Sequence, residues 1–582
     1  MRYIVEKNIK QADKFLNNGN HEAAYNMYKD LLKKYPKNVR IQEGLKKIDD
    51  AYLSNNLIDP PDDIINSFRT LFSQNKFDEI INFGLNYLLK YPQSLFILNI
   101  LGLSYANLND FENSITNFEK AINLSPTNIQ SLNNYGNILS KKGDFFSAIR
   151  HFKKAIQINS NYYQGYNNLG NVYLKQSNYV NSLECYQKSL QIKTNQAETN
   201  SCIGIVYEKL DKLSKAEVYF KKSLKIDFKN VNALINYAGL LHKLGNIKES
   251  TTYYEKALKI DKTNPTIRYN LSLINLYQGK FDYFNLFSER WKLDSFKKKH
   301  FYKNITDHDF KNFPDKTILV WEEQGIGDLI LFSRFLNNLK KEPLKIYCQF
   351  DKKVFNLFSR SFPKVQFLEI QNKAEFDFKM PIGDLAQKYL KSANHLKNIN
   401  TKYLNSNKSK TNKIKKQIEK KFGKNKIIVG LSWLSYNKDI GKNKSISLEH
   451  LKKILSIEEL IFLDLQYSNT IEERKEFEKN HGIKIHKIDY IDNLNDLDGL
   501  GSLISACDFI ISTSNTNAHL AGALGKTTYL ILPKGKGKLW YWTSEKNTSL
   551  WYNSIKIFEQ ESFGDWSKPI ENIYKKITNN LA

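Results

Sequence analysis

The chain has 582 residues, of which 41% are hydrophobic and 13% aromatic, and its formal net charge is +27. This length exceeds what one hydrophobic core supports, so we expect about two to four folding units and exclude disorder throughout. The excess Lys is spread along the whole chain instead of forming one stripe. This spread argues against nucleic-acid binding, although binding of an anionic polymer stays open as a third interpretation.

The cysteines lie far apart and form no CxxC pair, which argues against a disulfide framework and against a structural zinc site. They are Cys185, Cys202, Cys348 and Cys507. The first ten residues contain no apolar stretch of a secretory signal, and we find no apolar run long enough to span a membrane. We therefore expect a cytoplasmic protein without a membrane span and without a metal.

A repeat of 34 residues is the strongest pattern in the chain. A small residue recurs at Gly102, Gly136, Gly170, Gly204, Ala238 and Ser272. An aromatic residue follows sixteen positions after most of these, at Phe118, Phe152, Tyr186, Phe220 and Tyr254. The pattern resembles tetratricopeptide repeats, in which paired helices stack into a superhelix, and predicts such a superhelix over residues 1–291. Units near residues 5–38 and 61–94 are degenerate, and 41–57 predicts an extra helix.

An asparagine recurs two residues before the small position, at Asn134, Asn168, Asn236 and Asn270. A side-chain amide both donates and accepts hydrogen bonds, so an aligned ladder of Asn is able to hold an extended peptide backbone. Here the chain resembles the repeat arm of protein O-linked N-acetylglucosamine transferases, which implies a protein or peptide partner in the groove. The alternative is that these amides only join neighbouring helices.

The pattern changes after residue 291. Residues 292–315 predict a linker, and the rest alternates short apolar strands with helices, which predicts parallel sheets covered on both faces. Expected strands are 317–322, 344–350 and 365–371, then 426–433, 460–466, 483–488, 509–512 and 527–532. We therefore expect an α-solenoid followed by an α/β domain of two Rossmann-like lobes, at 316–407 and 426–582, separated by a Lys-rich segment at 408–425.

The first motif with residues suited to catalysis or ligand binding is the segment 321–328, between a strand and a helix. Gly325 and Gly327 allow a sharp turn that exposes backbone amides, and Asp328 lies in the first turn of the helix. The alternative for Asp328 is a helix cap, which contributes on the order of 1 kcal/mol.

The second motif is the segment 511–526, which contains Ser514, Asn515, Thr516 and His519. It leads from a strand end into a helix, and a helix N-terminus with hydroxyl and amide groups suits a diphosphate. His519 either reaches a ligand or packs in the core.

Both motifs together resemble the heptosyltransferase-like glycosyltransferases, a GT-B family (glycosyltransferase family 9), and in particular its bacterial-type subset fused to tetratricopeptide repeats. Segments 429–433, 444–448 and 539–542 add to the resemblance. It implies that Asp328 is the general base and that Lys444 faces the donor diphosphate. It also implies that Ser432, Gln466 and the loop from Ser514 to His519 line the donor pocket.

The resemblance implies an inverting transfer of a sugar from a nucleotide-diphosphate donor to a protein or glycan acceptor, with no cofactor or metal. One departure from the family pattern stands out. Where the family carries Asp-Thr-Gly, this chain has Ser514-Asn515-Thr516, so one sugar contact is missing. Either the donor sugar differs, or the chain is a non-catalytic tetratricopeptide scaffold with a degenerate glycosyltransferase domain.

Overall fold

The computed structural model describes residues 2–18, 20–36, 38–54, 59–297, 314–323, 325–369, 375–398, 401–437 and 440–581. The chain divides into two compact units, Met1–Phe228 and Lys229–Ala582. The last repeats therefore belong with the sheets, because Leu276, Phe281 and Phe284 lie in the same hydrophobic core as both α/β lobes.

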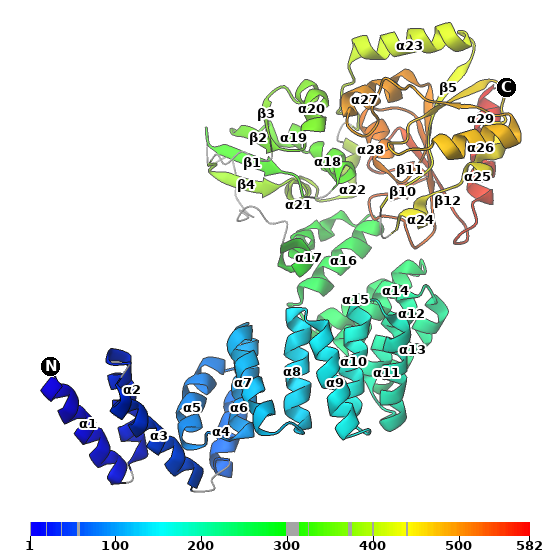
Figure 1. Ribbon diagram of the computed structural model, residues 1–582. Coiled ribbons are helices and arrows are strands. Elements are labelled where there is room, and N and C mark those ends of the chain that lie inside the picture. Colours follow the sequence, from blue (N-terminus) through cyan, green and yellow to red (C-terminus); the bar gives the residue numbers. More distant parts are fainter. Residues whose placement is uncertain are drawn as a thin grey trace. The chain divides into compact units, whose positions relative to one another are not determined.

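The first unit consists of helices joined by short turns (Figure 1). They are α1 (Arg2–Asn17), α2 (His21–Lys34), α3 (Val39–Ser54), α4 (Asp62–Ser73), α5 (Phe77–Lys90), α6 (Leu95–Asn107), α7 (Phe111–Leu124), α8 (Ile129–Lys142), α9 (Phe145–Ile158), α10 (Tyr163–Lys175), α11 (Tyr179–Ile192), α12 (Ala197–Lys209) and α13 (Leu213–Ile226). The expected extra helix is α3.

The small residues of the repeat allow the two helices of each pair to approach closely. A Cβ atom added at Gly136 would lie 2.8 Å from the Cε1 atom of Phe152, and the other repeat glycines of this unit meet their aromatic partners in the same way. A hydroxyl strengthens some of these contacts, since Ser114 Oγ donates to the Gly102 carbonyl at 2.7 Å. The periodic columns therefore describe helix-to-helix packing.

We expect Gly136→Ala to lower the free energy of unfolding by about 1–3 kcal/mol, because the added methyl group overlaps the Phe152 ring in a packed core. Helix propensity alone would change stability by about 1 kcal/mol in the opposite direction. Urea denaturation checks the sign. Gly239→Ala is the matched control, because its new Cβ meets only Tyr254 Oη at 3.6 Å and is expected to be neutral or stabilising.

The second unit begins with the last repeat helices, α14 (Val231–Lys243), α15 (Ile247–Ile260) and α16 (Pro265–Tyr277). They are followed by a 3-10 segment, η1 (Phe281–Lys292), and by α17 (Asp294–Lys297). Residues 298–313 of the expected linker lie outside the described residues. The start of the expected linker at 292 thus coincides with the end of η1.

A parallel four-stranded sheet forms the first lobe, in the order β3-β2-β1-β4. Its strands are β1 (Thr317–Trp321), β2 (Lys345–Gln349), β3 (Val365–Leu368) and β4 (Phe378–Pro381). Its helical segments are α18 (Ile326–Ser333), α19 (Leu336–Leu339), η3 (Lys352–Val354), α20 (Phe355–Ser361), α21 (Asp384–Tyr389) and α22 (Ala393–Asn398). The sequence patterns did not predict β4, and the helix expected after β1 is divided into α18 and α19.

An eight-stranded sheet forms the second lobe. Its strands are β5 (Ile427–Ser432), β6 (Leu460–Asp464), β7 (Ile485–His486), β8 (Phe509–Thr513), β9 (Thr528–Leu532), β10 (Ser544–Glu545), β11 (Thr548–Ser549) and β12 (Ile555–Glu559). The parallel part has the order β7-β6-β5-β8-β9-β12, and β10 and β11 extend it as antiparallel strands. This is the strand order of a doubly wound α/β sheet, with the direction of winding reversed between β5 and β8.

The helices of this lobe are α24 (Gly441–Lys444), α25 (Leu448–Leu455), α26 (Ile471–His481), α27 (Leu497–Ala506), α28 (Thr516–Ala523) and α29 (Ser567–Leu581). The Lys-rich segment expected to separate the lobes forms helix α23 (Lys408–Phe422), which packs against α27. Ile414 and Ile418 are buried, one helical turn apart, while the lysines cover the exposed side.

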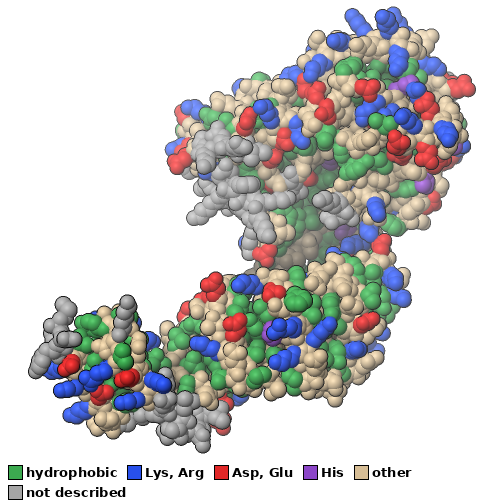
Figure 2. Space-filling model, viewed as in Figure 1, with side chains coloured by type: hydrophobic (Ala, Val, Ile, Leu, Met, Phe, Trp, Pro, Cys, Tyr) green, Lys and Arg blue, Asp and Glu red, His purple; other side chains and the backbone are tan. Residues whose placement is uncertain are grey.

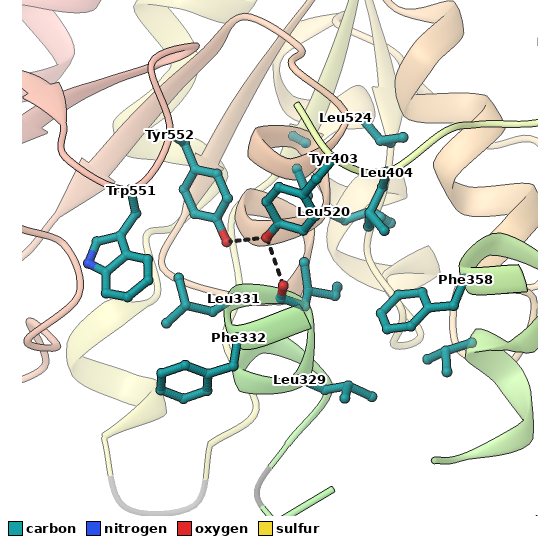
Figure 3. Packing of buried hydrophobic residues seen from close by; sticks show 14 of the residues in the cluster. Leu329, Leu331, Phe332, Phe358, Tyr403, Leu404, Leu520, Leu524, Trp551 and Tyr552 are labelled. Carbon is teal, nitrogen blue, oxygen red and sulfur yellow. Dashed lines mark hydrogen bonds between the residues drawn. The ribbon is translucent and has the colours of Figure 1, made fainter. Parts of the chain in front are cut away.

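One hydrophobic core joins both lobes and η1. Figure 3 shows part of it, where Leu331 and Phe332 of α18 lie near Leu520 of α28, Tyr403 and Trp551. Tyr403 Oη donates to the Ile330 carbonyl at 2.7 Å and lies 3.5 Å from Tyr552 Oη. The two lobes are therefore packed together through α18 and α28.

Charged side chains of both signs are interspersed on the face drawn in Figure 2, without a single basic stripe. Among the described residues, the helices are too short or too polar to cross a membrane.

Candidate functional site

The ends of parallel strands position the candidate site. In the second lobe, β5 ends at Ser432 and β8 leads into Ser514, the two neighbours at which the winding reverses. In the first lobe, β1 leads into the segment that carries Asp328 and is flanked by β2 and β4. Ligands of doubly wound sheets bind at these reversal points, outside the carboxyl ends of the strands.

The two motifs meet in space although they lie about 190 residues apart in the chain. A Cβ atom added at Gly327 would lie 3.2 Å from His519 Cδ2, 3.7 Å from His519 Nε2 and 3.9 Å from Thr516 Oγ1. A side chain at position 327 would therefore crowd the His519 ring. The expected sharp turn is absent at Gly325, whose φ of −83° and ψ of 171° describe extended backbone that any residue adopts.

Asp328 lies in the first turn of α18 and is partly exposed to solvent. Burial and the nearby Glu323 carboxylate raise its pKa to about 7, against the opposing influence of Lys444 and of the hydrogen bond from the Gly325 backbone amide. A carboxyl group with such a pKa exchanges protons near neutral pH, which suits a general base.

Lys444 ends the short helix α24 and is buried. Burial lowers its pKa to about 8, and the field of Asp328 counteracts the decrease. The loop around Gly537 covers it, since a Cβ atom at Gly537 would lie 3.3 Å from Lys444 Cγ. A cation and a carboxylate therefore share this desolvated region.

A buried hydrogen-bond network lies behind the loop. Ser432 Oγ donates to Gln466 Oε1 at 2.6 Å and accepts from Asn515 Nδ2 at 2.8 Å and Asn517 Nδ2 at 2.9 Å. Asn515 also caps α28, because its Oδ1 accepts from the Asn517 amide at 3.0 Å. The polar atoms of Ser432, Gln466 and Asn515 are thus engaged with one another and hold the loop in place.

His519 is surrounded by aromatic side chains. It stacks on Trp542 with ring centroids 4.6 Å apart, and its Nδ1 lies 3.0 Å from Tyr552 Oη. Burial and Lys444 lower its pKa to about 3, so the ring is neutral at physiological pH. Trp542 Nε1 also donates to Ser514 Oγ at 2.8 Å. One side of His519 therefore packs in the core, while Nε2 lies on the side near Gly327.

Sequence reasoning missed a buried charge cluster next to Asp328. Arg290 of η1 donates from Nε and Nη2 to the two carboxylate oxygens of Glu323, both at 2.8 Å, and from Nη2 to Asp384 Oδ1 at 2.6 Å. The Gly383 amide donates to Glu323 Oε1 at 2.7 Å, and Trp291 Nε1 donates to Asp384 Oδ2 at 3.2 Å. The only sequence signal was the pair Arg290-Trp291 at the point where the repeat pattern ends.

The first unit contains a groove of about 460 Å³ lined by α6, α8 and α10, and Asn134 and Asn168 line it. Asn168 Nδ2 donates to Asn133 Oδ1 at 2.8 Å, and Asn134 Nδ2 donates to Asn99 Oδ1 at 3.5 Å. Asn236 lies in α14 and Asn270 in α16, both in the second unit. The asparagines of the first unit therefore join neighbouring helices and also face an open groove.

No three His, Cys, Asp or Glu side chains of the described ranges come together in a way that could hold a metal ion.

Family models of the tetratricopeptide repeat match residues 97–128, 117–150, 163–195, 203–230 and 231–264, and a TPR repeat model matches 136–177. The chain therefore carries tetratricopeptide repeats, as the periodic columns predicted. These repeats support a protein-interaction role. The matches lie in the helical part of the chain.

Protein FlbA of Caulobacter vibrioides is 27% identical over 273 residues, which covers 43% of this chain and 44% of that protein. The chain thus matches less than half the length of this relative.

Solved structures also match parts of the chain. TTC0263, a thermophilic TPR protein of Thermus thermophilus, has 20% identity and a TM-score of 0.29, covering 31% of this chain and 97% of that one. YrrB, a TPR protein with an unusual peptide-binding site, has 17% identity and a TM-score of 0.26, covering 33% and 98%. The APC/C hetero-tetramer Cut9–Hcn1 has 13% identity and a TM-score of 0.36, covering 49% and 52%. At these TM-scores the likeness carries no argument about this chain.

Proposed function

We propose that this chain is a glycosyltransferase that moves a sugar from a nucleotide diphosphate to a protein or glycan acceptor held by the repeats, with inversion and without a metal. The observation that carries the proposal is the contact between the Asp328 loop and the helix that begins at Thr516, across the reversal points of two parallel sheets. Sugar transfer requires a base at the acceptor and a seat for the leaving diphosphate, and these two loops supply one each.

Asp328 accepts the proton of the acceptor hydroxyl in this proposal. Its pKa of about 7 makes it a stronger base than an ordinary aspartate. Burial keeps that pKa high, and the Glu323 carboxylate beside Arg290 raises it further.

The diphosphate binds beside the N-terminus of α28, where the Thr516 hydroxyl meets the field of Lys444. Negative charge developing on the leaving group is stabilised by the helix dipole and by this cation. His519 is neutral, so it contributes a ring nitrogen and no charge.

The buried network of Ser432, Gln466 and Asn515 has a supporting role in this proposal. These side chains fix the loop from Ser514 to Thr516, so their contribution to donor binding is indirect. Asn515 caps α28 and so fixes the loop at the point where the sequence departs from the family pattern. A different donor sugar then accounts for the departure.

The rival function is a non-catalytic scaffold, which the tetratricopeptide repeats favour on their own. A thermal melting screen against nucleoside diphosphates and their sugars separates the two. A ligand at 100 times its Kd stabilises the folded state by about 2.7 kcal/mol, enough for a clear Tm increase. We expect Lys444→Met to abolish the increase, with exposed Lys452→Met in α25 as its control. An unchanged Tm with every sugar nucleotide would leave the scaffold as the function.

The pH dependence of transfer is expected to be a narrow bell. The value of kcat/KM rises as the pH passes about 7, where Asp328 loses its proton, and falls as the pH passes about 8, where Lys444 loses its own. Initial rates with the sugar nucleotide found by melting, measured from pH 5 to 10, check this expectation. A flat profile across this range would contradict the assigned roles.

A further inference from the structure

The groove of the first unit is positively charged. Two rows of side chains cross it at the 34-residue period, one from each of α6, α8 and α10. The first row is Leu103, Asn137 and Asn171, and the second is Asn107, Lys141 and Lys175. Lys141 and Lys175 are the only charged residues among the described side chains that line this groove.

The polar groups of the groove are arranged for a ligand backbone. Asn171 Oδ1 accepts from Tyr186 Oη at 2.6 Å, which leaves the Asn171 Nδ2 group for the groove. Asn134 and Asn168 use their Nδ2 groups on neighbouring helices, which leaves oxygen acceptors there. Donors and acceptors therefore stand side by side, as an extended peptide requires.

The two lysines extend into the groove from α8 and α10. Lys175 Nζ donates to Ser140 Oγ at 3.2 Å, so the ammonium group of Lys175 in α10 reaches over α8, the helix that carries Lys141. A lysine near a helix C-terminus is also favoured by the helix dipole, but Lys142 serves that purpose in α8 without lining the groove.

We propose that this groove binds an extended acidic segment of a protein, with carboxylates of the segment at Lys141 and Lys175. Neighbouring repeat helices pack roughly 10 Å apart, and an extended chain advances about 3.3 Å per residue, so acidic residues three positions apart match the spacing of the two helices that carry the lysines. Nucleic acid is the poorer fit, because the described residues that line the groove include no aromatic side chain to stack on a base. This inference rests on the proposed function of the repeats as the part that holds a protein acceptor.

Fluorescence anisotropy with the full chain tests the inference at about 0.15 M salt, where exposed charges are largely screened beyond the groove. The probe is a labelled peptide of repeated Glu-Ser-Gly, compared with Gln-Ser-Gly and Lys-Ser-Gly peptides of the same length. Saturable binding of the Glu peptide alone supports the proposal. Equal binding of the Gln or Lys peptide, or no saturable binding of the Glu peptide, overturns it.

The matched variants separate the groove from the general positive charge of the chain. We expect Lys141→Gln with Lys175→Gln to weaken binding of the Glu peptide about tenfold, the effect of losing two exposed charge pairs. Lys120→Gln with Lys154→Gln removes the same charge at the same spacing, from exposed positions in α7 and α9, and should change the Kd by less than about twofold. An equal loss in both pairs overturns the proposal.

Two further measurements complete the test. Asn137→Ala with Asn171→Ala keeps the charge and should also weaken binding, since it removes backbone contacts. A mixed-sequence oligonucleotide provides the last comparison. If it displaces the peptide, binds more tightly than the peptide and loses affinity in the same groove variants, the groove is assigned to nucleic acid and the proposal is overturned. Peptide binding is measured without a sugar nucleotide. The absence of peptide binding therefore does not change the outcome of the melting screen, and a melting screen without a Tm increase does not change the outcome of the peptide experiment.

Discussion

Replacing Asp328 with Asn is expected to reduce sugar transfer by about 10²–10⁴-fold, the usual contribution of a general base. The amide keeps the size of the side chain but accepts no proton, so kcat falls while the KM for the donor changes little. Rates of product formation with the donor found by melting check this result. Exposed Asp489→Asn is the matched control and should leave the rate unchanged.

The same variant is expected to be more stable than the parent above pH 7. Below pH 3.8 the carboxyl group is neutral in both folded and unfolded chains, so Asp and Asn are equivalent there. Between this pH and about 7 the unfolded chain ionises while the folded chain keeps the proton, so the parent loses stability as the pH rises. We expect an advantage on the order of 1–2 kcal/mol after solvent screening and after the loss of attraction to Lys444. The measured quantity is the free energy of unfolding of the variant minus that of the parent. A smaller difference at pH 8 than at pH 4 would contradict the raised pKa.

Replacing Arg290 with Met is expected to lower the free energy of unfolding of the second unit by about 3–5 kcal/mol. Arg290 is fully buried and pairs with two carboxylates, Glu323 and Asp384. Without the guanidinium, both carboxylates stay in a dry environment with no cation among the described neighbours. Burial already raises the pKa of Glu323 and Arg290 opposes the rise, so the loss of stability should grow as the pH increases.

A double variant distinguishes loss of charge balance from loss of packing. Adding Glu323→Gln to Arg290→Met removes one orphaned carboxylate, and we expect it to restore a substantial part of the lost stability, as measured by urea denaturation at pH 8. The half-exposed pair Arg40–Asp13, at 3.5 Å, is the comparison, because Arg40→Met should cost no more than about 1 kcal/mol. Equal effects of the two arginine substitutions would contradict the structural role of the buried cluster.

The repeat fold was accessible from the sequence because its contacts are local. Gly136 and Phe152 are sixteen residues apart and touch within one helix pair, so the packing leaves a periodic trace in the sequence. Strands were harder to predict from the sequence where they are short and contain both polar and apolar residues. Strand β4 (Phe378–Pro381) exists because it pairs with β1, sixty residues earlier, and no local pattern reports that pairing. The packing of helix α23 against α27 was not visible in the sequence, because its lysines conceal Ile414 and Ile418.

The candidate site shows the same division. The sequence motifs, read through their resemblance to a family, singled out Asp328, Lys444 and the loop at Ser514, and the structure places their elements around one region. It could not be read from the sequence that Ser432 points into a buried network with Gln466 and Asn515. These three side chains lie at the ends of three different strands, and they become hydrogen-bond partners only when the strands pair in the sheet.

The sequence by itself therefore determined the repeat period, the helix pairs and the alternation of strands and helices, because each of these depends on contacts within a few tens of residues. Only the tertiary structure decided that Gly327 lies against His519, that Arg290 neutralises Glu323 beside Asp328, and that the last repeats share a core with both sheets. Such contacts follow from how whole elements pack, and the electrostatic environment of a side chain is set by whichever groups that packing brings near it.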